Sequence, residues 1–112
     1  RDLNLPLLPG VATSSEIMMA QEDGFTELKF FPAVQSGGIQ MLKAWQGPFG
    51  ELRFCPTGGI SPGNAAEFLA LSNVVCVGGS WLVPANAVES GNWSLITELA
   101  QATQALRGSR TA

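Results

Sequence analysis

Residues 27–33 have the sequence Glu-Leu-Lys-Phe-Phe-Pro-Ala, an apolar run that carries one cation, Lys29, and is interrupted at Pro32. Aromatic and aliphatic residues favour a strand, and proline ends it because its nitrogen cannot donate to a ladder. The nearly continuous apolar character is typical of a strand that is covered on both faces, as in a parallel sheet flanked by helices. The stretch therefore predicts a buried strand with Lys29 near its C-terminal end.

The same order of elements occurs four times: an apolar run, a turn of small residues and an amphipathic segment. The predicted strands are residues 5–8, 27–31, 52–55 and 74–77. The predicted helices are residues 13–19, 39–45, 65–71 and 93–106. Strands that alternate with helices predict βα units and a parallel sheet. Two architectures fit this α/β class: a small open sheet, or four consecutive units of a (β/α)8 barrel.

Helix boundaries have their own signals in the sequence. Residues 13–16, Thr-Ser-Ser-Glu, fit a capping box, in which the Thr hydroxyl and the Glu carboxylate accept from free amides at the helix start. Ser61 followed by Pro62 predicts a helix cap and a first-turn residue. Gly108 is a plausible stop for the last helix.

The length and composition limit the possible classes of protein. The chain has 112 residues, whereas a complete eight-fold barrel needs at least about 200. Only 13% of the residues are charged, which suggests that another segment covers part of the surface. A net charge of −3 without a basic run argues against nucleic-acid binding, and no apolar stretch is long enough to suggest a membrane span. Because the chain opens at Arg1 rather than with a signal peptide, we expect it to begin within a longer protein.

Two cysteines, Cys55 and Cys76, each lie in an apolar run that is predicted to form a strand. There is no Cys-x-x-Cys motif and no histidine, so the sequence gives little support for a zinc site. We expect two buried free thiols rather than a disulfide.

Lys29 is the first candidate for chemistry, because the reactive groups of βα barrels lie at the C-terminal ends of the strands. A lysine amine attacks a carbonyl only in its neutral form, and apolar neighbours such as Phe30 and Phe31 favour that form. The alternative is a lysine that extends to the strand end and forms only a salt bridge.

Glycine pairs follow two consecutive predicted strands and form the second candidate site. Gly58 and Gly59 precede a helix start, and residues 78–80 read Gly-Gly-Ser. Glycines let backbone amides approach an anion closely, and barrels often hold a phosphate in the loops after the last two strands. The alternative is two tight turns without a ligand.

Strand alternation gives one more prediction. If Lys29 and Thr57 point into a barrel, Glu27 and Arg53 do so too, on neighbouring strands, and we expect them to form an ion pair. The chain has no histidine or tyrosine, and none of its nine acidic residues is at the C-terminal end of a predicted strand. Carbonyl chemistry on a lysine needs a positioned acid or base, and this sequence does not obviously contain one.

Four segments together resemble the 2-keto-3-deoxy-6-phosphogluconate (KDPG) aldolase family. Residues 27–33 are similar to its Schiff-base strand, residues 53–62 to its next strand and loop, residues 78–84 to its last strand, and residues 8–13 to an earlier turn. The resemblance implies that residues 1–112 are the C-terminal half of a (β/α)8 TIM barrel. It also implies a cytoplasmic, homotrimeric class I aldolase, a lyase that cleaves KDPG to pyruvate and glyceraldehyde 3-phosphate in the Entner–Doudoroff pathway.

By this resemblance Lys29 forms the imine with pyruvate, without a metal or other cofactor. Phe31 and Thr57 line the pyruvate end of the site. The residues implied to hold the substrate phosphate are Gly58, Gly59, Gly79 and Ser80. The general base of the family lies on early strands that precede Arg1, and Glu27 does not replace it. Val34 departs from the family, which commonly has glutamate there.

Other functions remain open at the level of sequence. A sister aldolase could act on 4-hydroxy-2-ketoglutarate or on the phosphogalactonate epimer. A non-catalytic phosphate-binding βα module would keep the glycines without a reactive lysine, and a structural half-barrel would need a partner to cover its open edges. We expect the 112 residues alone to be a poor catalyst or none.

Overall fold

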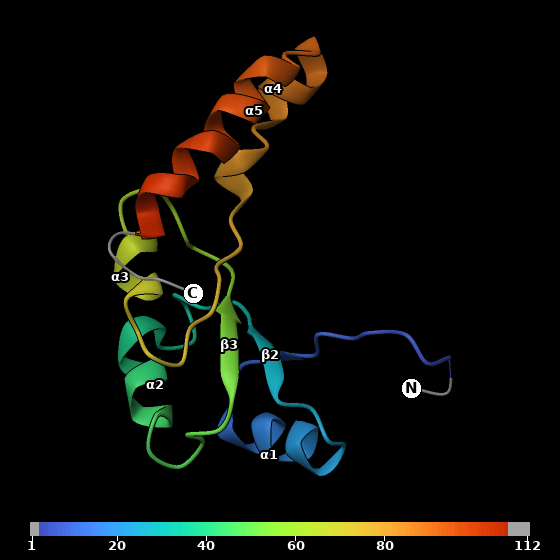
Figure 1. Cartoon of the computed structure of the whole chain (residues 1–112), viewed down its shortest axis with the longest axis vertical. Helices are drawn as coiled ribbons and strands as arrows, with labels where there is room; N and C mark the ends of the chain where they lie inside the picture. The colour runs from blue at the N-terminus through green and yellow to red at the C-terminus, as the bar shows by residue number, and fades with distance from the viewer. Residues whose placement is uncertain (1–2, 108–112) are drawn as a thin grey trace.

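A parallel sheet of three strands organises the chain in the computed structural model, which describes residues 3–107. The strands lie in the order β1 (Gly10–Val11), β2 (Glu27–Phe30) and β3 (Arg53–Pro56), and Lys29 pairs with Gly10 on one side and Cys55 on the other. Each strand is followed by a helix: α1 (Ser14–Glu22), α2 (Gly38–Trp45) and α3 (Ala65–Leu69) (Figure 1). This arrangement confirms the α/β class and the parallel sheet.

The predicted first and fourth strands are not formed in the described part of the chain. Residues 74–78 run beside β3 but make only isolated bridges, Phe54 with Val74 and Thr57 with Gly78. Residues 5–8 precede β1 in an extended arm that leaves the body of the molecule (Figure 1). Both segments are at the outer edges of the sheet, where no further strand stabilises them by pairing. The count of four βα units is therefore not confirmed.

Of the two predicted helix caps, one is formed by the predicted residues and the other by a residue further along the chain. At α1, Glu16 N donates to Thr13 Oγ1 at 3.2 Å and Thr13 N donates to Glu16 Oε1 at 3.1 Å, which confirms the capping box. At α3 the N-cap residue is Asn64 rather than Ser61, whose backbone N–H donates to Asn64 Oδ1 at 2.8 Å. The predicted stop at Gly108 lies outside the described residues.

The core lies between the sheet and its helices and is built around three aromatic rings. Phe30 and Phe54 are fully buried on the helix side of β2 and β3. The Trp45 ring of α2 stacks on Phe54 at 5.3 Å between centroids and meets the edge of Phe30 at 5.0 Å. Trp45 Nε1 donates to Ser14 Oγ at 3.0 Å, which ties α2 to α1. By alternation, Glu27 and Lys29 face the opposite side of the sheet.

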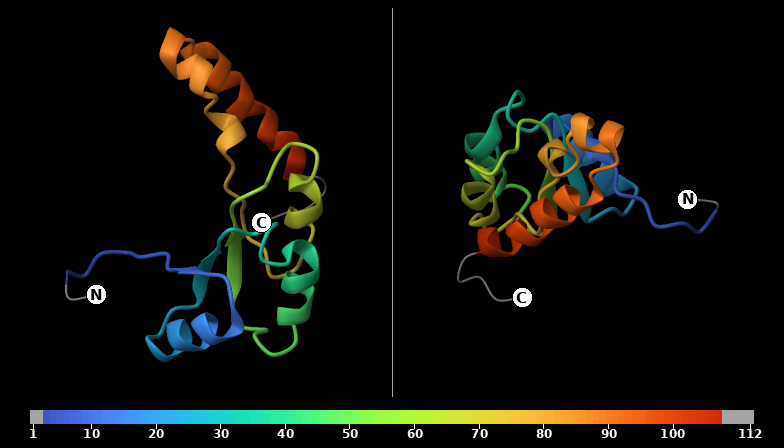
Figure 2. Two further views of the ribbon diagram at one scale, coloured as in Figure 1. Left: turned by 180° about the vertical axis from the view of Figure 1, so that it is seen from behind. Right: turned by 90° about the horizontal axis from the view of Figure 1, so that it is seen from above.

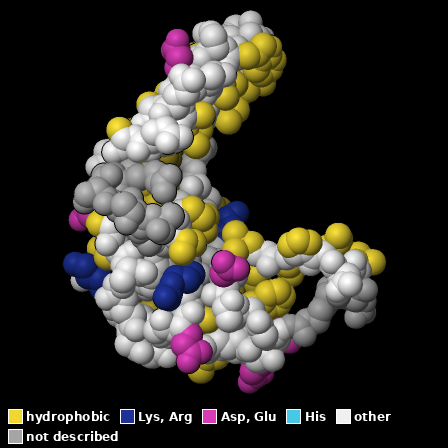
Figure 3. Space-filling model, viewed as in Figure 1, with side chains coloured by type: hydrophobic (Ala, Val, Ile, Leu, Met, Phe, Trp, Pro, Cys, Tyr) yellow, Lys and Arg dark blue, Asp and Glu magenta, His cyan; other side chains and the backbone are white. Residues whose placement is uncertain are grey.

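Within residues 80–107 the structure has four helices: η1 (Ser80–Leu82), α4 (Ala85–Ser90), α5 (Trp93–Ala102) and η2 (Thr103–Arg107). The predicted helix 93–106 is thus an α-helix followed by a 3-10 turn, whereas η1 and α4 were not predicted. Helices α4 and α5 form a hairpin that projects from the body (Figures 1 and 2). No residue of α5 is fully buried, and apolar side chains follow one side of the hairpin (Figure 3).

The same exposure occurs in the N-terminal arm, where Leu3, Leu5, Leu7 and Leu8 are 77%, 66%, 62% and 47% exposed. Such contiguous apolar surface agrees with the expectation that another segment covers part of this chain. Among residues 3–107, no helix has the length and apolar character needed to cross a membrane.

Candidate active site

Lys29 is held at the centre of the sheet, near the C-terminal end of β2. Its backbone N–H donates to Pro9 O at 2.8 Å, and its side chain is half-buried. Nζ lies 4.7 Å from the centroid of the Phe31 ring, which is 50% exposed. The described contact of the amine is thus an aromatic face, a cation–π arrangement that leaves the nitrogen accessible from the other side.

A cavity of about 370 Å³ opens beside Lys29 and Phe31. The cavity is also lined by Glu16, an acidic residue for which the sequence predicts only a role in the helix cap. Glu16 Oε1 accepts from Ala12 N at 2.8 Å and from Thr13 N at 3.1 Å, so this oxygen is engaged in the cap. The spacing of Glu16 six residues after Gly10, at the end of a strand, is the signal that could have placed it near Lys29.

Thr57 lies directly after β3 and links the other predicted residues. Its N–H donates to Phe30 O at 2.9 Å, and its hydroxyl lies 3.9 Å from the Cys55 sulfur. Gly78 lies close on the other side: a Cβ built on it would be 2.9 Å from Thr57 Oγ1. Only glycine permits this approach, so Gly78 fixes the distance between the two loops.

The loop after β3 is joined to the loop after β2. Ala33 N donates to Thr57 O at 2.7 Å and Val34 N donates to Gly58 O at 3.1 Å. Gly58 and Gly59 have φ angles of +99° and +78°, a conformation that favours glycine. Lys29, Phe31, Thr57 and the first glycine pair therefore lie together at the C-terminal ends of the strands.

Four backbone amides at this end of the sheet are open. Within residues 3–107, the N–H groups of Gly58, Gly59, Gly79 and Ser80 donate to no protein acceptor. Gly79 is packed against Trp81 so closely that a Cβ would lie 1.8 Å from the indole ring. Free amides in two adjoining glycine loops can hold an anion without a charged side chain.

Comparison with known proteins places this arrangement in a family. Residues 1–99 match the family model described as KDPG and KHG aldolase. The chain belongs to the KDPG and KHG aldolase family. It is 57% identical over 97 residues to the 2-dehydro-3-deoxy-phosphogluconate aldolase of Dickeya dadantii strain 3937, an alignment that covers 87% of this chain and 46% of the relative. It is 52% identical over 106 residues to the KHG/KDPG aldolase of Escherichia coli strain K12, covering 95% and 49%.

A solved structure of the family has the same fold. The KDPG aldolase of Legionella pneumophila, captured with pyruvate as a covalent carbinolamine, superposes with a TM-score of 0.86 and 56% identity, covering 88% of this chain and 48% of that one. The chain therefore spans about half the length of the aldolases that it matches.

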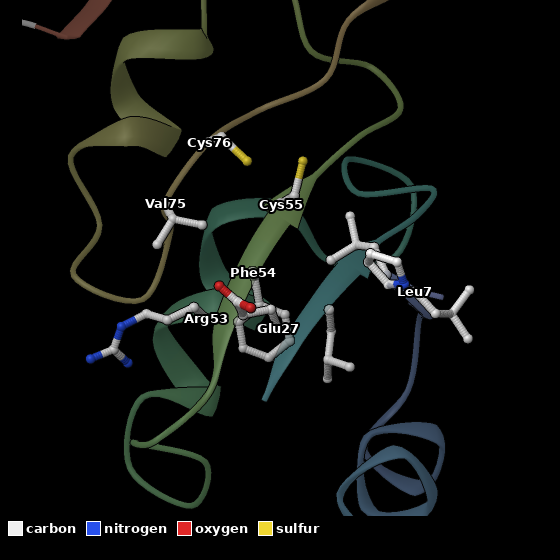
Figure 4. A pocket seen from close by; sticks show the side chains of 10 residues that line it. Leu7, Glu27, Arg53, Phe54, Cys55, Val75 and Cys76 are labelled. Carbon is white, nitrogen blue, oxygen red and sulfur yellow. The ribbon is translucent and has the colours of Figure 1, made fainter. Parts of the chain in front are cut away.

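The predicted ion pair of Glu27 and Arg53 is not formed. The two residues are Cα partners in the register of β2 and β3, as expected. However, Arg53 Nη1 donates to Gly50 O at 3.1 Å and to Leu52 O at 2.9 Å, and the guanidinium turns away from the Glu27 carboxylate (Figure 4). Both side chains are exposed on the open face, so water solvates each charge and neither needs the other.

The cysteines also differ from the prediction in one respect. Cys55 and Cys76 are both free thiols, but Cys55 is only half-buried and Cys76 is exposed. Partial desolvation of its thiol, the neighbouring Cys55 thiol and the Glu27 carboxylate raise the pKa of Cys76 to about 11. The thiol of Cys76 is consequently protonated at neutral pH.

Proposed function

We propose that the protein containing these residues is a class I aldolase that cleaves KDPG to pyruvate and glyceraldehyde 3-phosphate. One observation carries the proposal: Lys29 presents its amine beside the Phe31 ring at the end of a central strand, in a chain of this family. The Legionella pneumophila relative with covalent pyruvate supports the same chemistry.

In this mechanism the neutral Lys29 amine attacks C2 of the keto acid to give a carbinolamine. Loss of water forms an imine, whose protonated nitrogen accepts the electron pair released when the C3–C4 bond breaks. The aldehyde leaves, the resulting enamine is protonated at carbon, and hydrolysis releases pyruvate from Lys29. No step requires a metal, because the iminium is the electron acceptor.

The protons in these steps need a base near the reacting carbon and oxygen. Among the described residues, Glu16 shares the cavity with Lys29, but its Oε1 is engaged in the cap of α1. We therefore keep the expectation from the family resemblance, in which the base comes from a segment that precedes these residues.

The substrate phosphate would be held by the open amides of Gly58, Gly59, Gly79 and Ser80, together with the Ser80 hydroxyl. The bridge between Thr57 and Gly78 brings the two loops side by side. Thr57 and Phe31 would contact the pyruvate portion, because both adjoin Lys29 at the ends of β2 and β3. In this arrangement the phosphate lies at the end of the substrate away from the carbonyl that Lys29 attacks.

We also propose that residues 1–112 are the C-terminal half of one TIM-barrel domain, with four consecutive βα units when the barrel is complete. Support comes from the share of the relatives that the chain spans and from the exposed apolar arm and hairpin. The isolated chain should then be inactive or nearly so. The homotrimer and the cytoplasmic location implied by the family resemblance stay predictions.

The test is reduction with borohydride in the presence of pyruvate, applied to the complete protein and followed by intact mass and peptide mapping. We expect a pyruvate-sized addition on the peptide that contains Lys29. A folded protein that gains no adduct would exclude the Schiff-base mechanism and would favour a non-catalytic phosphate-binding module.

Rates with KDPG, 4-hydroxy-2-ketoglutarate and the phosphogalactonate epimer would then identify the substrate. The second of these is a specific alternative, since the Escherichia coli relative is named for both KHG and KDPG.

The phosphate site gives a separate prediction, that Gly59→Ala lowers kcat/KM for KDPG by about tenfold more than for 4-hydroxy-2-ketoglutarate, which has no phosphate. A Cβ at Gly59 would lie 2.7 Å from the Val34 side chain at a φ of +78°, so the loop must shift and misalign its amides. Steady-state rates with the two substrates measure the effect.

Gly63→Ala is the matched control, because a Cβ there meets only Ser61 Oγ, at an ordinary 3.7 Å. It should leave both rates unchanged. An equal loss with both substrates in Gly59→Ala would show that this loop supports the fold and does not bind the phosphate.

A further inference from the structure

Two thiols lie in one row with Lys29 across the open face of the sheet. Cys55 is the Cα partner of Lys29 on the neighbouring strand β3, and facing partners place their side chains on the same side. Cys76 lies on the next segment, residues 74–78, which runs along the far edge of β3. The order across the sheet is therefore Lys29, Cys55, Cys76.

The sulfurs of Cys55 and Cys76 project into the same space between β3 and residues 74–78 (Figure 4). Both residues line a cavity of about 370 Å³, together with Glu27 and Arg53. The Cys55 thiol is also among the groups that raise the pKa of Cys76, which agrees with this proximity. Neither thiol has a role in the aldolase mechanism.

We propose that Cys55 and Cys76 are an oxidation site, at which a peroxide or a small disulfide compound reversibly converts the two thiols into a disulfide that slows the aldolase. The modification itself is independent of the proposed function, whereas its effect on the rate rests on that function.

With hydrogen peroxide the steps balance as follows. The Cys55 thiolate attacks one peroxide oxygen, the O–O bond breaks, and hydroxide leaves and is protonated to water, which gives a sulfenic acid on Cys55. The Cys76 sulfur then attacks the Cys55 sulfur, the S–O bond breaks, and hydroxide leaves with the Cys76 proton as a second water. The two thiols lose two electrons in total, and the peroxide gains them.

The order of attack follows from the protonation of Cys76. The thiolate is the attacking form of a cysteine, and the pKa of Cys76 is raised to about 11, so this thiol is a poor first nucleophile. Desolvation is the largest cause of that shift, followed by the Cys55 thiol and the Glu27 carboxylate. Cys55 is half-buried and lines the same cavity as Cys76. Cys55 is thus the attacking residue and Cys76 the resolving residue.

A disulfide between Cys55 and Cys76 would change the active site by displacing Thr57. Gly78 is the bridge partner of Thr57, and its N–H donates to Pro56 O at 2.9 Å. The Cys55 sulfur lies 3.9 Å from Thr57 Oγ1. Drawing the Cys55 sulfur toward Cys76 removes this contact and moves β3 against the loop that carries Gly78 and Gly79. A displacement of about 1 Å near the reacting atoms is enough to lower a rate by more than tenfold.

The experiment treats the complete, folded protein with hydrogen peroxide and digests it without reduction. We expect a peptide that links Cys55 to Cys76 and a mass lower by two hydrogens, and we expect the cleavage rate to fall about tenfold and to recover with dithiothreitol. Cys55→Ser and Cys76→Ser should each prevent the link and keep the rate under peroxide. Because serine is close in size to cysteine, these variants should fold.

Mass analysis separates this proposal from the aldolase function, since it detects the link whether or not the protein cleaves KDPG. Persistent free thiols, or oxidation of the two cysteines to separate sulfinic acids, would overturn the site. A linked protein that keeps its full rate would overturn the connection to the active site. An untreated protein that forms no pyruvate adduct would instead refute the proposed function.

Discussion

Replacing Lys29 by methionine should abolish the pyruvate adduct and lower kcat/KM for KDPG cleavage by at least about 10⁴-fold. Methionine keeps an unbranched side chain beside Phe31 but has no amine to attack C2. Since Lys29 is only half-buried and its described contact is the Phe31 ring, the fold should tolerate the change. Intact mass after borohydride reduction and steady-state kinetics measure the two effects.

Lys43→Met is the matched control, because Lys43 is exposed in the last turn of α2. It removes the same charge and should keep both the adduct and the rate within about twofold, as is usual for a surface substitution. If the Lys29 variant still gained pyruvate on another lysine, that residue would be the nucleophile and the assignment to Lys29 would be wrong.

The features that could be predicted from the sequence depend on neighbours close in the chain. The capping box at Thr13 and Glu16 needs only four residues, and the structure confirms it. Strand β2 is identified by its own apolar run and by Pro32. The positions of Lys29 and Thr57 at the strand ends follow from alternation and register, which are also local. Local rules therefore placed the predicted site residues at one end of the sheet.

The features that could not be predicted depend on partners distant in the chain. Residues 5–8 and 74–77 have strand-like composition, but strands form by pairing, and each segment is at an edge of the sheet. The prediction of an ion pair between Glu27 and Arg53 depends on a closed interior from which water is excluded. In the open sheet Arg53 instead donates to Gly50 O and Leu52 O. The same openness leaves Cys76 exposed.

Two further differences concern residues with weak signals. Helix α4 follows Pro84, whose φ of −63° suits a helix start, and its alanines could have indicated a helix. Glu16 was assigned to the cap alone, although it also lines the cavity beside Lys29. One carboxylate can cap a helix and also line a pocket, because the end of a strand and the start of the following helix lie on the same side of the sheet.

Phe54→Ala should lower the free energy of unfolding by about 3–5 kcal/mol, the largest stability effect that we expect from one substitution. The Phe54 ring is fully buried and stacks on Trp45 at 5.3 Å, so its removal leaves a cavity between β3 and α2. A domain is stable by only about 5–15 kcal/mol, so the variant should also be less soluble. Denaturation by urea, followed by tryptophan fluorescence, measures the loss.

Phe31→Ala is the contrasting variant, because the Phe31 ring is 50% exposed and lies over the Lys29 amine. It should cost less than about 1 kcal/mol of stability and yet slow imine formation. The two variants would separate packing from chemistry, since the Phe54 ring is buried against the helices while the Phe31 ring lies beside Lys29. Equal stability losses in the two variants would mean that the aromatic stack does not hold β3 in place, and the positions of Thr57 and its glycine loop would then need another explanation.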